Sequence, residues 1–398
     1  MRKQEFVEPL KLYSIIREQN YPFIMEFTDK FGGKKYTLIS FDPDEILKVK
    51  SDSDPFDSLK EMNFKGLIVG YIPYDAVLRY IGKKGFENSV FGCYTSYFLY
   101  DNFGNLYSNF EDAEKIVEKA KKEEIDVKDG GAEVLSVEDR EYFEKIVEKG
   151  KEYIEEGEVY QIVLSREYKV RSDFDPFEIY LRMKELNPSP YMFLLEFEKA
   201  LIGSSPETMG KIEGKIFRIN PIAGTAKRIV GEESETIEKL LKDEKERAEH
   251  VMLVDLARND VRKVCKAGSV KVERFMEAVV YPSVIHIESE VFGELRENIT
   301  HFDAMRAAFP AGTVTGAPKR RAVELIDELE RSKRGVYAGA VGFFSENVSD
   351  MAIAIRMVEY NKKCKIRAGA GIVADSIAEK EFLETENKIS KVLKAVGL

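Results

Sequence analysis

The chain contains few cysteines. It has three in 398 residues, Cys93, Cys265 and Cys364, and they lie far apart in the sequence. Their odd number and wide spacing exclude the paired pattern of a zinc site and do not suggest a disulfide framework. Such usage is typical of a reducing compartment, so we expect a cytoplasmic protein.

Long apolar runs are also missing. No stretch approaches the 18 apolar residues that a membrane-spanning helix needs. The first residues, MRKQEFVEPL, lack the apolar segment of a secretory signal peptide. We therefore predict neither a membrane anchor nor export.

Positive charge is in deficit. The chain has 61 lysines and arginines against 71 acidic residues, a net charge of −10, and no basic stripe. Nucleic acid is therefore not an expected partner. An acidic enzyme acting on an anionic substrate would need a metal ion or focused arginines to overcome its own field.

Familiar nucleotide and hydrolase motifs are absent as well. The sequence has no G-x-x-x-x-G-K-[ST] loop, no G-x-G-x-x-G after a strand and no G-x-S-x-G elbow. The usual markers of nucleotide hydrolysis, dinucleotide chemistry and serine-esterase chemistry are thus missing. The composition, 44% hydrophobic and 33% charged, is that of an ordinary globular protein, and the length allows two lobes or one large domain.

The first third of the chain is expected to be rich in strands. Strands are predicted at Pro22–Phe27, Tyr36–Phe41, Gly66–Tyr74 and Tyr94–Tyr100 from short apolar runs bounded by turn residues. The polar segment DVKDGGA at 126–132 is the best linker candidate. We therefore predict a β-rich, regulatory-type domain at 1–130 and a catalytic domain at 131–398.

Strands also dominate the rest of the sequence. They are predicted at Val159–Val170, Leu201–Pro206, Lys215–Pro221, Tyr281–Phe292, Val336–Phe344, Met351–Glu359 and Lys365–Asp375. Because few of them alternate with helices, parallel βαβ units are not expected. The predicted class is α+β, with large, mostly antiparallel β-sheets packed in a sandwich and helices outside.

Two predicted helices carry paired carboxylates beside apolar residues. In Asp375–Leu398, Glu381 and Glu384 stand at i and i+3, with Lys388 one turn further, beside a stripe that includes Phe382, Leu383, Ile389 and Val392. In Asp243–Leu256, Glu246 and Glu249 repeat the spacing before a mostly apolar turn. Facing pairs would form an oxygen cage for a hard divalent ion such as Mg²⁺; the alternative is solvated glutamates.

Other residues stand in unusual contexts. His286 lies between isoleucines and shares a strand face with Glu288, so it is either a core histidine or a proton-transfer group. Arg356 lies in an apolar strand and needs a carboxylate partner. Thr313 lies in a glycine-containing loop, and Gly369-Ala370-Gly371 ends a strand. Each segment is either a simple turn or a stretch of backbone whose N–H groups bind an anion.

At this point the motifs resemble the chorismate-utilising enzymes, and among them the large subunit of anthranilate synthase. The resemblance covers roughly 136–398 closely and the N-terminal third more loosely, through PFIMEF and GLIVGYIPYD. The motifs are Pro221–Thr225 (PIAGT), Lys245–Asp260 (KERAEHVMLVDLARND), Val284–Ser289 (VIHIES), Phe309–Ala322 (FPAGTVTGAPKRRA), Tyr337–Phe344 (YAGAVGFF), Ala352–Arg356 (AIAIR) and Ala368–Lys388 (AGAGIVADS…EFLETENK).

The resemblance implies an anthranilate synthase component I-like fold and a role for each candidate residue. Glu249 and Glu384 would contact Mg²⁺, while Glu246 and Glu381 hold its waters. His286, as the acid at the departing C4 hydroxyl, and Thr313 would be catalytic. The residues implied in binding the substrate carboxylates and enolpyruvyl group are Tyr337, Arg356, Gly369, Ala370, Gly371 and Lys388.

By resemblance, two positions distinguish the different activities within the family. Gln161 and Ala223 stand where other members carry a lysine that activates water or attacks the ring. Their absence leaves the site open to ammonia, which implies conversion of chorismate to anthranilate and pyruvate in tryptophan biosynthesis. The alternatives are an aminodeoxychorismate synthase, because some of these lack the lysine too, and a non-catalytic sensor or scaffold.

Ammonia needs a source. The segment around Cys93, FGCYT, lacks the glycine-flanked elbow of a glutaminase nucleophile. A separate glutamine amidotransferase subunit is therefore expected, in a two-plus-two assembly by resemblance.

The resemblance also implies an allosteric tryptophan site. Its two motifs would lie at Ile24–Phe27 and Asn187–Phe193, with Glu26, Phe27, Pro190, Tyr191 and Met192 as the candidate contacts. Phe27 replaces the serine of the family motif. Its ring would occupy part of the pocket, so the sequence leaves open whether tryptophan inhibits.

Overall fold

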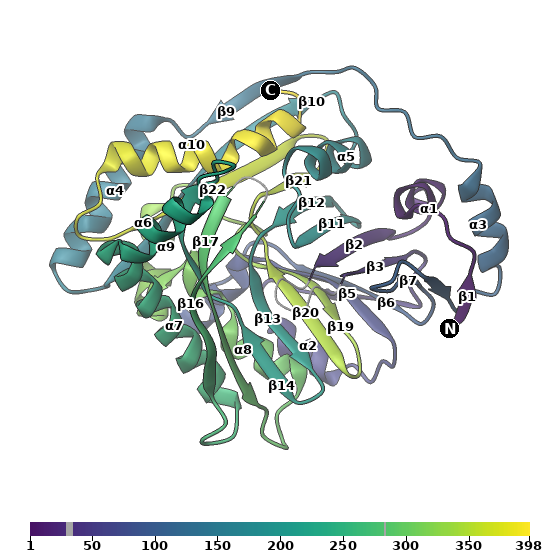
Figure 1. Cartoon of the computed structure of the whole chain (residues 1–398), viewed down its shortest axis with the longest axis horizontal. Coiled ribbons are helices and arrows are strands. Elements are labelled where there is room, and N and C mark those ends of the chain that lie inside the picture. The colour runs from purple at the N-terminus through teal and green to yellow at the C-terminus, as the bar shows by residue number, and fades with distance from the viewer. Residues whose placement is uncertain (29–34, 282–283) are drawn as a thin grey trace.

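Two large antiparallel sheets form the centre of the protein, with helices around them (Figure 1). The structure is a computed structural model that describes residues 1–28, 35–281 and 284–398. The predicted α+β sandwich of antiparallel sheets is confirmed. Within those ranges, no helix is long and apolar enough to cross a membrane.

In the described residues, the first sheet has twelve strands and connects the N-terminal third to the rest. In spatial order they are β1 (Arg2–Gln4), β8 (Leu106–Ser108), β7 (Phe98–Tyr100), β3 (Lys35–Ser40), β2 (Phe23–Thr28), β11 (Tyr191–Glu196), β12 (Ala200–Ser205), β21 (Met357–Tyr360), β22 (Cys364–Ile372), β10 (Gln161–Ser172) and β18 (Gly316–Ala317), with β9 (Ala132–Val137) paired to β10. The ladder between β2 and β11 joins residues on the two sides of the predicted boundary.

The second sheet has ten strands over the same described ranges. They are β15 (Ile222–Lys227), β17 (Val284–Glu294), β14 (Ile216–Ile219), β13 (Thr208–Glu213), β20 (Val348–Ile353), β19 (Ala340–Phe344), β5 (Leu67–Ile72), β6 (Ser89–Tyr94) and β4 (Glu45–Val49), with β16 (Lys271–Val280) paired to β17. Of the predicted strand Tyr281–Phe292, residues 282 and 283 lie outside the described residues.

The helices lie on the outer faces of the sheets (Figure 1). They are α1 (Pro9–Ile16), α2 (Pro55–Glu61), α3 (Ala113–Lys121), α4 (Arg140–Glu155), α5 (Pro176–Leu186), α6 (Glu233–Lys242), α7 (Glu244–Val264), α8 (His301–Ala308), α9 (Lys319–Leu329) and α10 (Ala378–Ala395), with short 3₁₀ turns η1 (Tyr74–Ile81) and η2 (Gly312–Val314). Helix α10 packs on β22, and α7 packs on β15 and β17.

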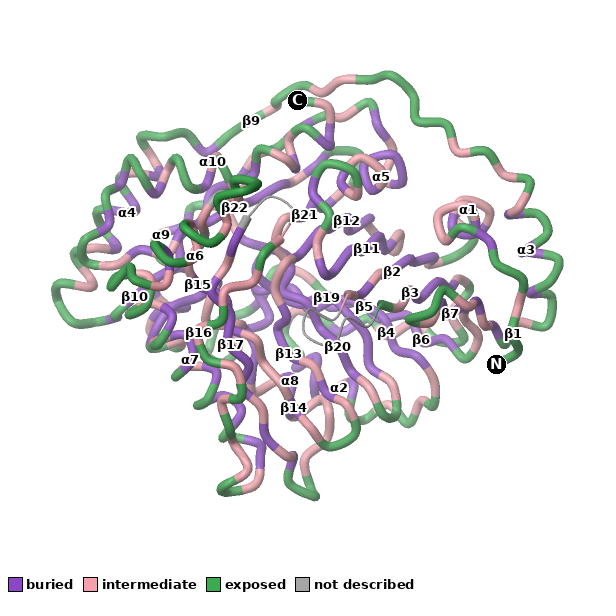
Figure 2. The backbone as a smooth tube through the Cα atoms, viewed as in Figure 1, coloured by how far each residue is buried: buried purple, intermediate pink, exposed green. Residues whose placement is uncertain are grey.

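The core lies between the sheets and beneath the helices, where Figure 2 shows buried strands. Phe193 of the first sheet and Val69, Val341 and Phe343 of the second belong to one buried cluster, so the sheets pack face to face. The linker candidate is exposed over 126–130 and has no regular structure. Because β2 and β5 are hydrogen-bonded to β11 and β19, strands from both predicted domains share the two sheets.

Two helix predictions need correction. The apolar turn of α7 is not buried on all sides. One face is buried, through residues such as Leu253 and Val254, while Val251 is 48% exposed. In α10 the predicted stripe is buried at Ile389 and Val392, but Leu383 is 49% exposed. A helix that lies on a sheet buries one narrow face and leaves its flanks in water.

The predicted strand Met351–Glu359 is two strands. Strand β20 ends at Ile353 in the second sheet, and β21 begins at Met357 in the first. Arg356 lies in the connection with a φ of 51°, a left-handed conformation that is rare for residues other than glycine. The prediction that Arg356 belongs to an apolar strand is therefore wrong, because the chain changes sheets there.

Candidate active site

The two helices that carry the paired carboxylates meet at their N-terminal turns. Asp243 caps α7 by accepting from the backbone N–H groups of Lys245 and Glu246, both at 3.0 Å. Lys245 then reaches Asp375, just before α10, with Nζ and Oδ2 3.6 Å apart. The cap and this ion pair set the two acidic segments beside each other.

All four carboxylates gather at this junction. Burial raises the pKa of Glu246, Glu249 and Glu381, and the nearby carboxylate of Glu384 raises each of them further. Glu381 is buried, whereas the Glu384 side chain is 46% exposed. The site is thus an acidic cluster that is closed on one side and open to solvent on the other.

The carboxylates already have polar partners. Glu249 Oε1 accepts a hydrogen bond from Gln161 Nε2 at 2.9 Å. Glu384 forms an ion pair with Lys388, one turn further along α10, and Lys388 Nζ also donates to the carbonyl of Gly369 at 3.1 Å. Residues of α7, α10, β10 and β22 therefore form one polar network.

The donor set suits a hard divalent cation. It consists of carboxylate oxygens with the amide oxygen of Gln161, which is buried and has no hydrogen-bond partner. Among the residues that the structure describes, no three histidine, cysteine, aspartate or glutamate side chains converge closely enough to hold a metal ion by themselves. The protein would thus supply part of the coordination shell, and a bound substrate carboxylate and waters would supply the rest.

His286 lies on β17, between β15 and β16. Its Nδ1 is 3.2 Å from the carbonyl of Gly224, so an Nδ1–H donated to this oxygen would fix the ring's orientation. The ring is partly buried and lies 5.5 Å from that of Tyr281, measured between centroids. Tyr281 in turn donates to the carboxylate of Glu288, the predicted neighbour of His286 on this face.

Thr313, in the 3₁₀ turn η2, and Arg356, in the connection from β20 to β21, lie near one shared carboxylate. Thr313 Oγ1 donates to Glu207 Oε2 at 2.8 Å. Burial lowers the pKa of Arg356, while Glu207, Tyr337 and Glu384 oppose this by electrostatic attraction, so these three groups lie within its field. Arg356 therefore has the carboxylate neighbours that its sequence context predicted.

The glycines of β22 permit close approach. Gly371 lies opposite Val163 of β10, and a Cβ at this position would be 2.8 Å from Gln161 Nε2. At Gly369 a Cβ would be 2.8 Å from the carbonyl of Leu164 and 2.9 Å from the Tyr337 hydroxyl. Because real Cβ atoms do not come so close, a larger residue at 369 would push β22 away from the β10 backbone, and one at 371 would displace the amide end of Gln161. Ala370, between them, is fully buried.

Comparison with known proteins identifies the family of the chain. The profile of the chorismate binding enzymes matches residues 16–394. The chain belongs to this family. The chain is 65% identical to anthranilate synthase component 1 of Archaeoglobus fulgidus, over 100% of both chains. It is 53% identical to anthranilate synthase component 1 of Thermococcus kodakarensis, over 100% of this chain and 99% of the relative.

Solved structures of the family have the same fold. Anthranilate synthase component I from Streptococcus pneumoniae superposes with a TM-score of 0.78 at 34% identity, over 90% of this chain and 92% of that one. The menaquinone-specific isochorismate synthase MenF from Escherichia coli gives 0.79 at 18% identity, over 99% and 92%. The predicted membership of the chorismate-utilising family is confirmed.

The residues of the predicted tryptophan site also meet in this family member. Met192 and Tyr191 of β11 pair with Glu26 and Phe27 of β2, and the Pro190 carbonyl accepts from the backbone of the same strand. Glu26 accepts from Lys184 Nζ at 2.7 Å. Phe27 is 3% exposed and stacks on the ring of Tyr36, with centroids 4.6 Å apart.

The sequence did not single out two residues, one that contacts Thr313 and one that joins α7 to β17. Glu207, which follows Ser205-Pro206 after β12, contacts Thr313; no periodicity or spacing marks it. His250 is fully buried on α7, and its Nε2 lies 2.6 Å from Ser289 Oγ on β17. Burial lowers the pKa of His250 to about 4, so a neutral imidazole joins α7 to the strand of His286.

Proposed function

We propose that the protein is the synthase subunit of an anthranilate synthase, which converts chorismate and ammonia to anthranilate, pyruvate and water. The observation that carries the proposal is the full-length 65% identity to an anthranilate synthase component 1. The carboxylates of α7 and α10, which lie near Arg356 and Lys388, supply a site for an anionic substrate and its counter-ion.

The cofactor proposed for this site is Mg²⁺, held directly by Glu249 and Glu384 and through water by Glu246 and Glu381. When bound, Mg²⁺ would neutralise the ring carboxylate and stabilise the charge that develops as the ring reacts. Burial first, and the neighbouring carboxylates second, raise the pKa of Glu246, Glu249 and Glu381, and a bound cation would offset both effects, which supports the assignment.

The remaining candidates bind substrate and move protons. Arg356, Tyr337 and Lys388 would hold the carboxylates and the enolpyruvyl group, with the Gly369–Gly371 backbone against the ring. His286 would protonate the C4 hydroxyl, which leaves as water while ammonia adds at C2. Loss of the C2 proton and of pyruvate then gives the aromatic ring. Thr313, bonded to Glu207, would orient substrate beside these groups.

The ammonia would come from a separate glutamine amidotransferase subunit, in a two-plus-two assembly. All three cysteines are buried and free. Burial raises the pKa of Cys93 and Cys364 to about 12 and that of Cys265 to about 11, which leaves almost no thiolate for attack on glutamine. Buried free thiols also support the proposed cytoplasmic location.

The proposal extends to regulation by tryptophan. The residues 1–130 would contribute β2 to the inhibitor site at β2 and β11. In this chain the ring of Phe27 packs against Tyr36, Tyr191 and Phe343. We propose that these rings fill the space that an inhibitor would need, and that inhibition is weak.

Incubation with chorismate, ammonium and Mg²⁺ tests the function, because anthranilate fluoresces and pyruvate is released in equal amount. Formation of 4-amino-4-deoxychorismate without pyruvate would instead identify an aminodeoxychorismate synthase. A protein without turnover would be the sensor or scaffold. Loss of turnover in His286→Ala with Mg²⁺ binding retained would support catalysis at this site.

A further inference from the structure

A buried ion pair lies next to residues that are proposed to bind the substrate. The side chains of Arg334 and Glu330 are 2% and 3% exposed, and the guanidinium donates to the two carboxylate oxygens at 2.7 and 3.0 Å. Ser165 of β10 donates its backbone N–H and its hydroxyl to the same carboxylate, at 2.7 and 2.8 Å. Burial acts to raise the pKa of Glu330, but the charges of Arg334 and Arg367 outweigh it and lower this pKa. The pair is therefore ionised and bidentate.

The remaining hydrogen bonds of Arg334 hold two separate segments of backbone. Its Nη1 donates to the carbonyl of Val314 at 2.8 Å, and its Nη2 donates to the carbonyl of Val163 at 2.6 Å. Val314 ends η2 and directly follows Thr313. Val163 lies on β10, opposite Gly371 of β22. One buried side chain thus joins the η2 turn to the strand that supports the glycine segment.

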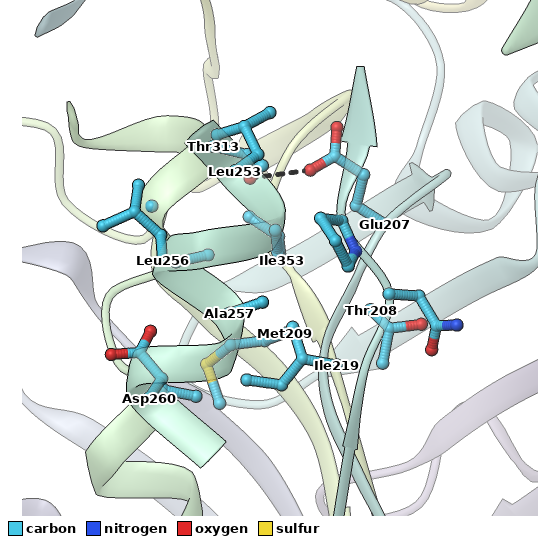
Figure 3. Close-up of a pocket in the computed structure, with 15 residues that line it drawn as sticks. Glu207, Thr208, Met209, Ile219, Leu253, Leu256, Ala257, Asp260, Thr313 and Ile353 are labelled. Carbon is cyan, nitrogen blue, oxygen red and sulfur yellow. Dashed lines mark hydrogen bonds between the residues drawn. The ribbon is translucent and has the colours of Figure 1, made fainter. Parts of the chain in front are cut away.

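The bond to η2 places the side chain of Thr313. Thr313 lines a small cavity, where its hydroxyl donates to Glu207 Oε2 at 2.8 Å (Figure 3). The turn also meets β10 through the carbonyl of Thr315, which accepts from the backbone N–H of Val163 at 2.9 Å. Because η2 has only three residues, a shift of the Val314 carbonyl would carry Thr313 with it. The guanidinium therefore keeps the Thr313 hydroxyl in its present position.

Arg334 also lies beside the ring of a third candidate residue, Tyr337. Its guanidinium carbon is 5.9 Å from the centroid of the Tyr337 ring and 4.5 Å from that of Tyr74. A guanidinium within about 6 Å of an aromatic centroid is attracted to the ring. The Tyr337 hydroxyl lies close to β22, where a Cβ at Gly369 would be 2.9 Å away. The cation that holds η2 and β10 therefore also contacts the tyrosine that is proposed to bind substrate.

We propose that Arg334 is a positioning residue for the chorismate site. Its ion pair with Glu330 orients the guanidinium, which then holds Thr313, β10 and Tyr337 in one geometry. Because its four hydrogen bonds all go to protein groups, Arg334 acts through these neighbours and not on the substrate itself. The proposal rests on the proposed function, in which these neighbours bind chorismate.

Arg334→Lys tests the proposal. A lysine keeps the charge but lacks the planar fork, so it cannot hold the carboxylate and both carbonyls at once. Anthranilate formation is followed with chorismate varied at saturating ammonium and Mg²⁺, and thermal unfolding gives the folded fraction. Thr313→Val is measured alone and in combination with Arg334→Lys, to determine whether the two side chains act together.

The matched control is Arg182→Lys on α5. The Arg182 guanidinium likewise donates to two backbone carbonyls, those of Lys394 and Ala395, at 3.0 and 2.9 Å. It also lies 4.2 Å from the centroid of the Phe174 ring. These contacts fix the C-terminal end of α10, so the control removes a similar set of bonds away from the candidate site.

Arg334→Lys should raise the KM for chorismate about tenfold or more, whereas the control should stay within about twofold of wild type. Thr313→Val should lower kcat/KM about tenfold in the wild-type background, but within about twofold in the Arg334→Lys background, where the hydroxyl is already misplaced. A merely structural role would reduce the folded fraction and hence the apparent kcat, with the KM unchanged.

An unchanged KM in Arg334→Lys, or effects of the two substitutions that simply multiply, overturns the proposal. If Arg334→Lys does not fold, Glu330→Gln carries the same test, because it keeps the size of the side chain and removes the charge that orients the guanidinium. Wild-type protein that makes no anthranilate from chorismate and ammonium would instead overturn the proposed function.

Discussion

Gln161 Nε2 donates to Glu249 Oε1 across a distance of 2.9 Å, and this bond joins the first residue of β10 to the acidic face of α7. The amide is neutral, so it orients the carboxylate without cancelling its charge. A Cβ at Gly371 would lie against the same amide nitrogen. The side chain at 161 thus determines both the charge and the shape of this part of the site.

Gln161→Lys is expected to impair cation binding. The ammonium of a lysine would form a buried ion pair with Glu249 and compete with Mg²⁺ for its oxygens. We expect the Mg²⁺ concentration for half-maximal anthranilate formation to rise about tenfold, measured by fluorescence under metal titration.

Tyr160→Lys is the control, because Tyr160 is adjacent in sequence but 75% exposed. It should leave the metal requirement unchanged. A Gln161→Lys variant with the wild-type Mg²⁺ requirement would contradict the role assigned to Glu249.

Glu384→Gln tests the second proposed ligand. The change removes one negative charge from the cluster and the ion-pair partner of Lys388, while side-chain size is kept. Metal-dependent activity should fall about a hundredfold or more, with the thermal midpoint nearly unchanged because the side chain is half exposed. The control is Glu379→Gln, on the same helix, where the wild-type side chain is 60% exposed; it should keep full activity. If the wild type, Glu384→Gln and Glu379→Gln all required the same Mg²⁺ concentration, Glu384 would be excluded as a ligand.

Sequence patterns predicted the parts of the fold that depend on local periodicity. The spacing of Glu246 with Glu249, and of Glu381 with Glu384, identified the helices on which these residues lie. Short apolar runs likewise identified β2, β10 and β22 to within a few residues. These features repeat along one element and can be read from it.

Contacts between distant elements could not be predicted in this way. The bond of Gln161 to Glu249 spans 88 positions, and that of Thr313 to Glu207 spans 106. The left-handed turn at Arg356 interrupts a run that reads as one strand, because the apolar residues before and after it belong to different sheets. Only the packing of the sheets determines these relationships.

Asp75 should make stability fall as the pH rises. It is 2% exposed, its Oδ2 has no hydrogen-bond partner, and burial raises its pKa from 3.8 to about 6. Between these pH values the folded protein holds a proton that the unfolded chain has released. The free energy of unfolding therefore decreases as the pH rises through this window. Asp75→Asn should therefore raise the free energy of unfolding by about 3 kcal/mol at pH 7 and change it little at pH 4.

Urea unfolding at the two pH values measures this difference. Asp126→Asn, in the exposed linker segment, is the control and should have no effect at either pH. Equal effects of Asp75→Asn at pH 4 and pH 7 would show that the carboxyl of Asp75 is not held protonated by burial.

Phe27→Ser tests whether the ring at 27 blocks an inhibitor site. Removing it opens space between Tyr36, Tyr191 and Phe343, and loss of a buried phenylalanine should cost about 3 kcal/mol of stability. If the space is the tryptophan pocket, the variant should be inhibited by tryptophan at concentrations at least about tenfold below those needed for wild type.

Phe41→Ser separates the two effects of that change. Phe41 stacks on Phe110, with centroids 4.8 Å apart, and packs against a different core cluster from Phe27. It should lower stability without increasing sensitivity to tryptophan. Because a general loosening of the N-terminal third would sensitise both variants alike, inhibition gained only by Phe27→Ser would assign the pocket to β2 and β11. Inhibition curves that match wild type in both variants would mean that tryptophan does not bind there.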